Sequence, residues 1–348
     1  MPIQRRGPTN PADAGDEVPA PSPAESSPSV PSPTRSSALP VAVQFPLAAV
    51  LSFSMASLGY SLLGEVTKGE LAAVSRSQDT WEEVGLLAGW RGIELALGWF
   101  GKLDSLDVAM LDLLSHGPHV SLPLLLCFYL LSTFYNLSPS TALYALLIDI
   151  TSVAAPFYLL RPLSAVHTPS AAAKLPNREL LDVVLQLYTA ALSTGIYSVV
   201  LVLSMRFILP RILVVYFANL PTVEPAYAAS YTSILPVTVV FGVAASTFIF
   251  APFATTGHVK EDDKIAAFDP VEASLGETVW WNTWGYTAKT KVVIRRTAVA
   301  VFVSAINTYL ACSKTVSGVE PLGAAAYAGV WAFAALCSGV GLGFVGNE

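Results

Sequence analysis

The chain carries little charge for its length. Only 13% of its 348 residues are Asp, Glu, Lys or Arg, whereas about a quarter of a soluble domain is charged. The 19 Lys and Arg residues against 25 Asp and Glu residues leave a formal charge of −6, and no dense basic block is present, which excludes tracking of a nucleic-acid backbone. Hydrophobic residues make up 53% of the chain and mean hydropathy is +0.56. This composition excludes an ordinary soluble enzyme and indicates lipid as the main solvent.

Cysteine is also scarce. Cys127, Cys312 and Cys337 lie in apolar runs without metal-ligand spacing, so they indicate neither a disulfide framework nor a zinc site. The sequence lacks a Walker loop, a dinucleotide-binding glycine fingerprint, a Gly-x-Ser-x-Gly elbow and a His-rich iron-binding box. These absences disfavour ATP-driven transport, redox chemistry with a bound nucleotide and hydrolysis by an elbow serine. We expect no metal and no cofactor.

The first 37 residues differ in composition from everything after them. Nine prolines and seven serines occupy these positions. A segment of this kind cannot bury enough apolar surface to offset its chain entropy. We therefore predict a disordered Pro/Ser-rich tail at 1–37 and a transmembrane helical domain at 38–348.

Long apolar runs dominate the chain beyond the tail. A helix needs about twenty mostly apolar residues to cross roughly 30 Å of hydrocarbon. Seven runs are good candidates: 41–63, 121–138, 141–160, 183–205, 230–252, 296–313 and 321–345. Several contain proline, so neighbouring helices must satisfy the freed backbone groups. The predicted fold class is therefore all-α, a polytopic transmembrane helix bundle of seven or eight spans.

The run from Val84 to Phe100 is the eighth candidate, and two interpretations of it stay open. Arg91 and Glu94 sit in its middle at i and i+3, where they share a helical face and can pair. A central charge costs roughly 2.5–3.5 kcal/mol on insertion scales, so the segment crosses only as part of a bundle. The alternative is an amphipathic helix in the interface, with Arg91 and Glu94 on its wet face.

Orientation depends on that same segment. With eight spans, the positive-inside rule places the tail in the cytoplasm. With seven spans, the tail lies on the opposite side of the membrane, while every loop after residue 121 keeps the same side in both arrangements. Three Ser-Pro pairs in the tail suit cytoplasmic kinases and favour eight spans.

Asp149 and Glu94 are the candidate catalytic residues. Asp149 lies in the run TALYALLIDITSVAAPFYLL, where a lipid-facing carboxyl is costly, so we expect it to face the bundle interior. Such a carboxyl is a candidate proton donor, cation partner or ion ligand; the alternative is a bond to a neighbouring helix only. Arg91 and Glu94, as an embedded pair, would shape a polar pocket. In this pocket Glu94 is a candidate acid and Arg91 a candidate binding residue.

An acidic cluster with two histidines follows the run from Val84 to Phe100. Asp104, Asp107 and Asp112 precede His116 and His119, which together offer hard and imidazole ligands. No recognised metal spacing holds, and HGPH contains a Gly-Pro break. A solvated loop is therefore preferred to a metal site.

The polar loop at 254–294 contains a second group of candidate binding residues. Trp280, Trp281, Trp284 and Tyr286 precede Lys289, Lys291, Arg295 and Arg296, an order typical of headgroup-level anchoring. The alternative is a cap over the bundle, whose tryptophan faces stabilise a cationic ligand. Asn136 begins Asn-Leu-Ser, a candidate glycosylation acceptor.

The Pro/Ser-rich tail, the seven or eight spans and the stretch WWNTWGYTAKTK resemble fungal polytopic membrane proteins encoded with terpenoid and indole-diterpene biosynthetic enzymes. This resemblance implies either a membrane terpene cyclase, whose embedded carboxyls protonate an alkene or epoxide, or an accessory protein. It further implies a hydrophobic small-molecule substrate, membrane-enzyme partners and a location in the endoplasmic reticulum or another endomembrane. The alternative function is a small-molecule transporter or an organising subunit whose tail and Trp-rich loop recruit partners.

Overall fold

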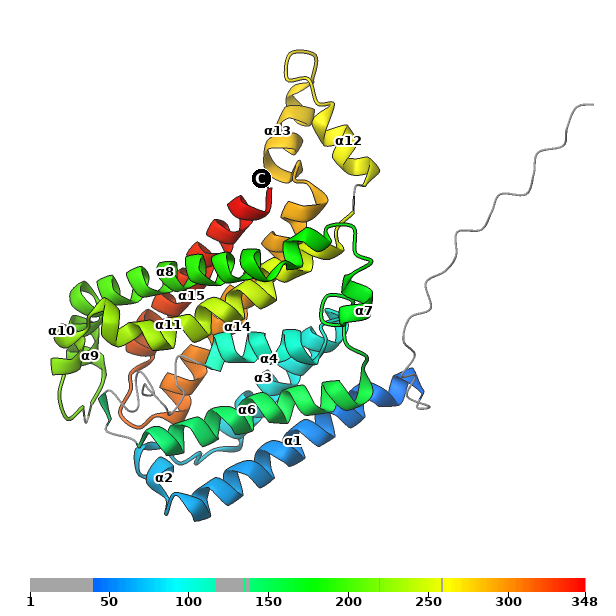
Figure 1. Ribbon diagram of the computed structural model, residues 1–348. Helices are drawn as coiled ribbons and strands as arrows, with labels where there is room; N and C mark the ends of the chain where they lie inside the picture. The colour runs from blue at the N-terminus through cyan, green and yellow to red at the C-terminus, as the bar shows by residue number, and fades with distance from the viewer. Residues whose placement is uncertain (1–39, 117–133, 136–137, 219, 258, 348) are drawn as a thin grey trace, which may run out of the picture. The chain divides into compact units, whose positions relative to one another are not determined.

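The structure, a computed structural model, describes residues 40–116, 134–135, 138–218, 220–257 and 259–347. These segments are almost entirely helical (Figure 1), and their β pairing is limited to the isolated bridges Ser75–Val316 and Phe217–Val319. The helices are α1 (Val41–Val66), α2 (Glu70–Val74), α3 (Trp81–Phe100), α4 (Ser105–His116), α6 (Pro139–Leu160), α7 (Pro169–Ala172), η2 (Arg178–Leu181), α8 (Val183–Phe207), α9 (Leu209–Tyr216), α10 (Glu224–Ala228), α11 (Tyr231–Ala245), η3 (Ser246–Phe250), η4 (Ala251–Thr255), α12 (Lys260–Ala266), α13 (Leu275–Trp284), α14 (Ala288–Leu310), η5 (Ala311–Thr315) and α15 (Pro321–Asn347).

Six helical segments in the described part of the chain are long and apolar enough to cross a membrane. They are Ala42–Val66, Ser140–Leu160, Val183–Phe207, Tyr231–Thr255, Ala288–Thr315 and Pro321–Gly346. They confirm the all-α bundle and six of the predicted spans. The tail at 1–37, Asn136 and most of the predicted span at 121–138 lie outside the described residues.

Two segments differ from the simplest reading of the sequence. The predicted polar loop at 254–294 contains α12 and α13, and α14 begins at Ala288, where the Thr287 hydroxyl accepts the N–H of Thr290 at 3.3 Å. The run at 84–100 is helical in α3 but is not among the six apolar segments. Its Arg91 and Glu94 side chains are only 14% and 11% exposed, so they are not the wet face of an interfacial helix.

Helix pairs and one aromatic cluster hold the bundle together. α14 lies along α15, α8 along α11, and α1 along α6, while the shorter α4 contacts α6, α11 and α14. Between α8, α11 and α15, the Tyr197 ring stacks on Phe241 at a centroid distance of 5.4 Å, and Phe241 meets Trp331 at 5.1 Å. All three rings are nearly inaccessible, so this cluster is a central part of the core.

Gly242 allows α11 to approach α8 closely, and its replacement gives a test of that contact. A Cβ at position 242 would lie 2.6 Å from the Ala190 carbonyl oxygen and 2.7 Å from the Thr194 nitrogen, both backbone atoms. We expect Gly242→Ala to destabilise the protein by about 1–3 kcal/mol, the usual cost of overpacking. Gly195→Ala on α8 is the matched control, because its Cβ meets nothing within 4 Å. Thermal unfolding of the two purified variants checks this, and equal melting temperatures would contradict the close contact.

Candidate functional site

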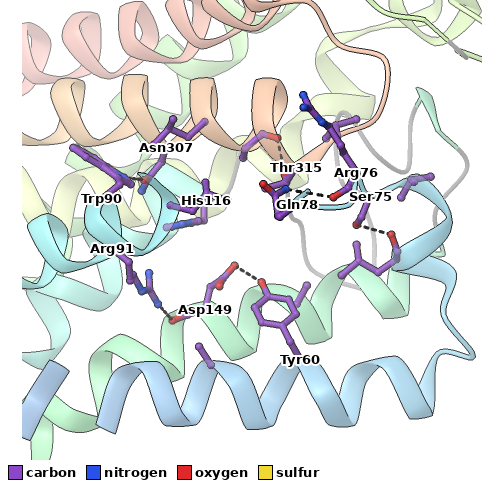
Figure 2. Close-up of a pocket in the computed structure, with 18 of the residues that line it drawn as sticks. Tyr60, Ser75, Arg76, Gln78, Trp90, Arg91, His116, Asp149, Asn307 and Thr315 are labelled. Carbon is purple, nitrogen blue, oxygen red and sulfur yellow. Dashed lines mark hydrogen bonds between the residues drawn. The ribbon is translucent and has the colours of Figure 1, made fainter. Parts of the chain in front are cut away.

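A cavity of about 510 Å³ lies between helices from the two ends of the chain. Its wall comes from α1, α2, α3, the end of α4, α6, α14 and η5. Leu71, Val74, Leu87, Ala145 and Leu310 make part of that wall apolar. Its polar groups include Tyr60, Arg76, Arg91, His116, Asp149 and Asn307 (Figure 2). Glu94 also lines the cavity. The cavity therefore combines apolar surface with a concentrated group of ionisable side chains.

Both carboxyls predicted to be catalytic line this cavity. Ser138 caps the N-terminus of α6, its hydroxyl accepting the Thr141 N–H at 3.4 Å, and Pro139 occupies the first turn. Asp149 then falls one turn after Ala145, and both residues border the cavity. The Tyr60 hydroxyl from α1 donates a hydrogen bond to Asp149 Oδ2 at 2.9 Å. Asp149 thus faces the bundle interior, and Glu94 reaches the same cavity from α3.

Arg91 connects α3, α4 and α6. Its guanidinium donates to the backbone carbonyl oxygen of Asp149 at 3.2 Å and to the Ser152 hydroxyl at 2.7 Å. It also lies 3.4 Å from Asp112 Oδ1 and 3.6 Å from Glu94 Oε2. A buried guanidinium is tolerated when its donors find such acceptors, and both terminal nitrogens of Arg91 have them.

Asn307 joins Glu94, Ser115 and Trp90 through hydrogen bonds. This residue was not singled out from the sequence. Its amide nitrogen donates to Glu94 Oε1 and, at 2.9 Å, to the Ser115 hydroxyl, while its amide oxygen accepts the Trp90 indole N–H. Asn307 therefore links α14 to α3 and α4 and fixes the Glu94 carboxyl beside the Trp90 ring. The signal available in the sequence was a lone amide within the apolar run AVAVFVSAINTYLA.

Asp112 and His116 complete the buried cluster. Asp112 Oδ1 lies 2.9 Å from His116 Nδ1, one turn apart on α4. The preferred interpretation of Asp104, Asp107 and Asp112 as a solvated loop is wrong: each is at most 4% exposed, and α4 is helical from Ser105 to His116. His119 lies outside the described residues.

The charges of the ionisable groups beside the cavity do not cancel when every group is ionised. Arg91 and a protonated His116 supply two positive charges, whereas Glu94, Asp112 and Asp149 supply three negative charges when ionised. An uncompensated charge is costly in such surroundings. The cluster reaches neutrality when one carboxyl keeps a proton, and the arrangement therefore suits proton transfer.

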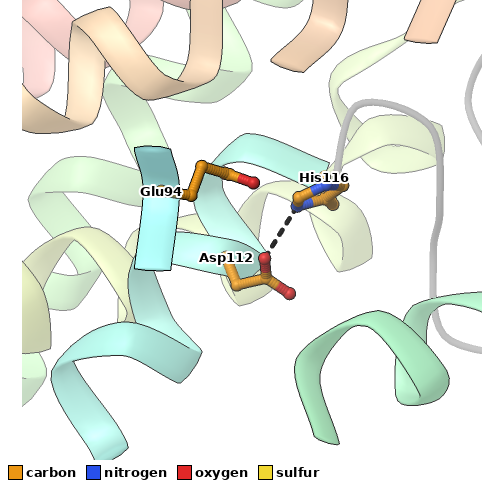
Figure 3. A group of neighbouring side chains, drawn as sticks. All are labelled: Glu94, Asp112 and His116. Carbon is orange, nitrogen blue, oxygen red and sulfur yellow. Dashed lines mark ion pairs between the residues drawn. The ribbon is translucent and has the colours of Figure 1, made fainter. Parts of the chain in front are cut away.

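Glu94, Asp112 and His116 are also close enough to ligate a metal ion. One ligand atom from each lies within 4.8 Å of the others, and Figure 3 shows the three side chains converging from α3 and α4. The Arg91 guanidinium, however, already contacts both carboxylates. Its positive charge opposes a second cation at the same place. The prediction of no metal remains a prediction.

A second buried polar cluster lies away from the cavity. Arg296 forms a bidentate pair with Asp107, with Nη1–Oδ1 at 2.7 Å and Nη2–Oδ2 at 3.0 Å. Asp104 accepts the Asp107 N–H at 2.7 Å and the Ser164 N–H at 2.8 Å, and its Oδ2 lies 2.6 Å from His167 Nδ1. These contacts fasten α4 to α14 and to the segment after α6. Because they join three parts of the described chain, we assign the cluster a structural role, although His167 Nε2 is buried without a hydrogen-bond partner.

The pKa values of Asp104 and His167 are shifted apart. Burial alone would raise the pKa of Asp104, but hydrogen bonds from His167 and two backbone N–H groups bring it below its ordinary value of 3.8. Burial alone would lower the pKa of His167, but its hydrogen bond to Asp104 and the negative charges of Asp104 and Asp107 raise it above 6.5, against the opposing charge of Arg296. The pair is therefore complete in mildly acidic solution.

Stability should follow these two titrations. The stabilisation that His167 gives the folded protein is fully present below about pH 6.5 and is lost as pH rises through its raised pKa. The stabilisation from Asp104 is present above about pH 3.8 and is lost as pH falls through its lowered pKa. We expect His167→Gln to lower stability by about 1.5–3 kcal/mol at mildly acidic pH, the usual value of a charged hydrogen bond. The variant should also lose the alkaline decline. Melting temperatures of the purified protein across pH check this, and an identical pH profile for the variant would contradict the pair.

The predicted aromatic binding residues lie elsewhere. Trp280, Trp281 and Trp284 belong to α13 and Tyr286 follows it, and none of the four is among the residues that line the cavity. All four are at least 36% exposed. The structure thus brings together Asp149, Glu94 and Arg91 but not the aromatic group, and the cap interpretation has no support from the cavity wall.

These features define a multi-pass integral membrane protein with a cavity between its helices that ionisable side chains line. Comparison of the chain with protein-family models, with curated protein sequences and with solved structures finds no match. The function therefore has to be inferred from the site itself.

Proposed function

We propose that this cavity is the active site of an acid-catalysed reaction on a hydrophobic, terpenoid-like metabolite within the membrane. One observation carries the proposal: Asp149 and Glu94, on different helices, line one cavity together with the Tyr60 hydroxyl and the Trp90 ring. The resemblance noted above supplies the substrate class, an alkene or an epoxide. It also supplies the proposed endomembrane location and membrane-enzyme partners.

Asp149 is the proton donor in this scheme. Tyr60 donates its hydrogen bond to Oδ2, so a proton held by the carboxyl sits on Oδ1. Transfer of that proton to an alkene carbon or an epoxide oxygen generates a carbocation on the substrate and leaves a carboxylate that Tyr60 stabilises. Arg91, which donates to the backbone carbonyl oxygen of Asp149, holds this turn of α6 in place.

Glu94 receives the proton that ends the reaction. Loss of a proton from carbon beside the cationic centre forms a new double bond, and the Glu94 carboxylate takes that proton while Asn307 donates to it. Trp90 offers an aromatic face for the cation before this step. The substrate is isomerised or cyclised with no net gain or loss of atoms, and returning the proton from Glu94 to Asp149 resets the site.

Deuterium incorporation tests this proposal. Membranes containing the full chain are incubated in D₂O with a polyprenyl alkene and with its terminal epoxide, and the products are analysed by mass spectrometry. Protonation of the alkene by an exchangeable carboxyl places one deuterium on carbon in the product. The Asp149→Asn variant should give far less of this product at equal protein level, and undiminished product formation by that variant would exclude Asp149 as the donor.

Transport is the second candidate function, and the buried charge network favours it specifically. Embedded ionisable groups that face a cavity are also typical of proton and substrate pathways. Uptake of the unmodified alkene or epoxide into sealed vesicles, without any product, would favour transport over catalysis.

A further inference from the structure

Helix α13 presents a stripe of large apolar side chains outward. Leu275 is 84% exposed, Val279 58%, Trp280 54% and Trp284 65%. Leu275 and Val279, like Trp280 and Trp284, are four residues apart, so each pair is adjacent on the helix surface. With 3.6 residues per turn, the four side chains together spread over about half of the helix circumference. Nothing in the described part of the chain covers this face.

The remaining tryptophan of α13 fixes how the helix is oriented. The Trp281 ring stacks on Phe268 at a centroid distance of 4.8 Å with 10° between the planes, and its indole N–H donates to the Ile265 carbonyl oxygen at 3.2 Å. Trp281 therefore fastens α13 to the end of α12. With Trp281 turned toward α12, the stripe of four residues is held on the outside.

The stripe also lies close to the start of a membrane span. Only residues 285–287 separate Trp284 from Ala288, where the span Ala288–Thr315 begins. At no more than about 3.6 Å per residue, Trp284 lies within roughly 14 Å of that point. The Asp262 carboxylate accepts the Ala288 N–H at 2.9 Å, which ties α12 to the same end of α14. The interfacial zone extends about 5–8 Å beyond the hydrocarbon on each side of a bilayer, so the Trp284 end of α13 can reach it.

We propose that this stripe of Leu275, Val279, Trp280 and Trp284 lies in the headgroup region of the protein's own bilayer. Tryptophan suits this zone, because its ring is apolar and its indole N–H still requires a polar partner. Lys289 and Lys291, in the first turn of α14, follow at the depth of the lipid phosphates. The inference concerns a surface separate from the cavity and is independent of the proposed reaction.

Lipid quenching of a single label tests the assignment in the full chain. Cys127, Cys312 and Cys337 are replaced by Ala, one cysteine is introduced by Val279→Cys, and it carries a small environment-sensitive dye. Glu272→Cys in the same background is the matched control, because Glu272 is exposed in the connection between α12 and α13 and lies off the stripe. Both proteins are placed in phosphatidylcholine nanodiscs, with and without bromine near the carbonyl end of the acyl chains.

The Val279 label should lose most of its emission in brominated lipid, whereas the Glu272 label should keep nearly all of its emission. Adding Trp280→Ser and Trp284→Ser should restore emission at position 279, because the two aromatic anchors are gone. A Val279 label that brominated lipid leaves as bright as the control overturns the proposal. Shielding of that label from an aqueous quencher without lipid quenching would also overturn it and would assign the stripe to a protein contact.

Discussion

Replacing Asp149 by Asn should lower product formation by about 10²–10⁴-fold, the usual contribution of a positioned general acid. The amide keeps nearly the shape of the carboxyl, and its oxygen can still accept the hydrogen bond that Tyr60 donates at 2.9 Å. Packing of α6 against α1 is therefore preserved while the transferable proton is lost. Turnover per folded protein, measured by deuterium incorporation in isolated membranes, gives the comparison.

Two further variants separate the chemistry from a general effect of removing charge. Glu94→Gln should cause a comparable loss, because the carbocation then lacks its proton acceptor. Glu65→Gln is the matched control: Glu65 lies on α1 beyond Tyr60, is exposed and does not line the cavity. Its turnover should equal that of the unmodified protein. Full activity of the Asn variant at position 149 would remove the acid-catalysis proposal.

The membrane spans were predictable because each is a local property of the sequence. A run such as 321–345 is apolar throughout, so length and hydropathy identify it without knowledge of its neighbours. The predicted span at 296–313 begins later than the helical segment Ala288–Thr315, because Lys289, Lys291 and Arg295 lower the hydropathy at its start. Those residues lie within the first eight residues of α14, where long cationic side chains can reach the headgroup region.

The site was predictable only in part, because its contacts join distant segments. Asp149 and Glu94 could be singled out, since a carboxyl within an apolar run has few stable positions other than the bundle interior. The burial of Asp107 could not, because its partner Arg296 lies far along the chain on α14. Without that partner, three closely spaced aspartates have the composition of a solvated loop. The role of Asn307 depends on Glu94, Ser115 and Trp90 in the same way.

Arg91→Leu should be the most destabilising single change in the cavity wall, at about 3–5 kcal/mol. It removes the cation from Glu94 and Asp112, whose side chains are 11% and 4% exposed, and leaves two buried carboxyls without it. The Asp149 carbonyl oxygen and the Ser152 hydroxyl lose their donor as well. Thermal unfolding of the protein in nanodiscs measures the effect.

Arg76→Leu is the control that isolates burial as the cause. Arg76 pairs with Glu83 at 2.8 Å, a shorter distance than either ion pair of Arg91, but its side chain is 44% exposed. Exposed pairs contribute about 0–1 kcal/mol, so this variant should melt close to the unmodified protein. Adding Asp112→Asn to Arg91→Leu should recover part of the loss, because the carboxylate left unpaired is then neutral. Two outcomes would contradict this prediction: equal destabilisation by the two arginine variants, or no recovery in the double variant. Either would show that the Arg91 network is solvated. The charge balance from which we inferred a proton on one carboxyl would then no longer hold.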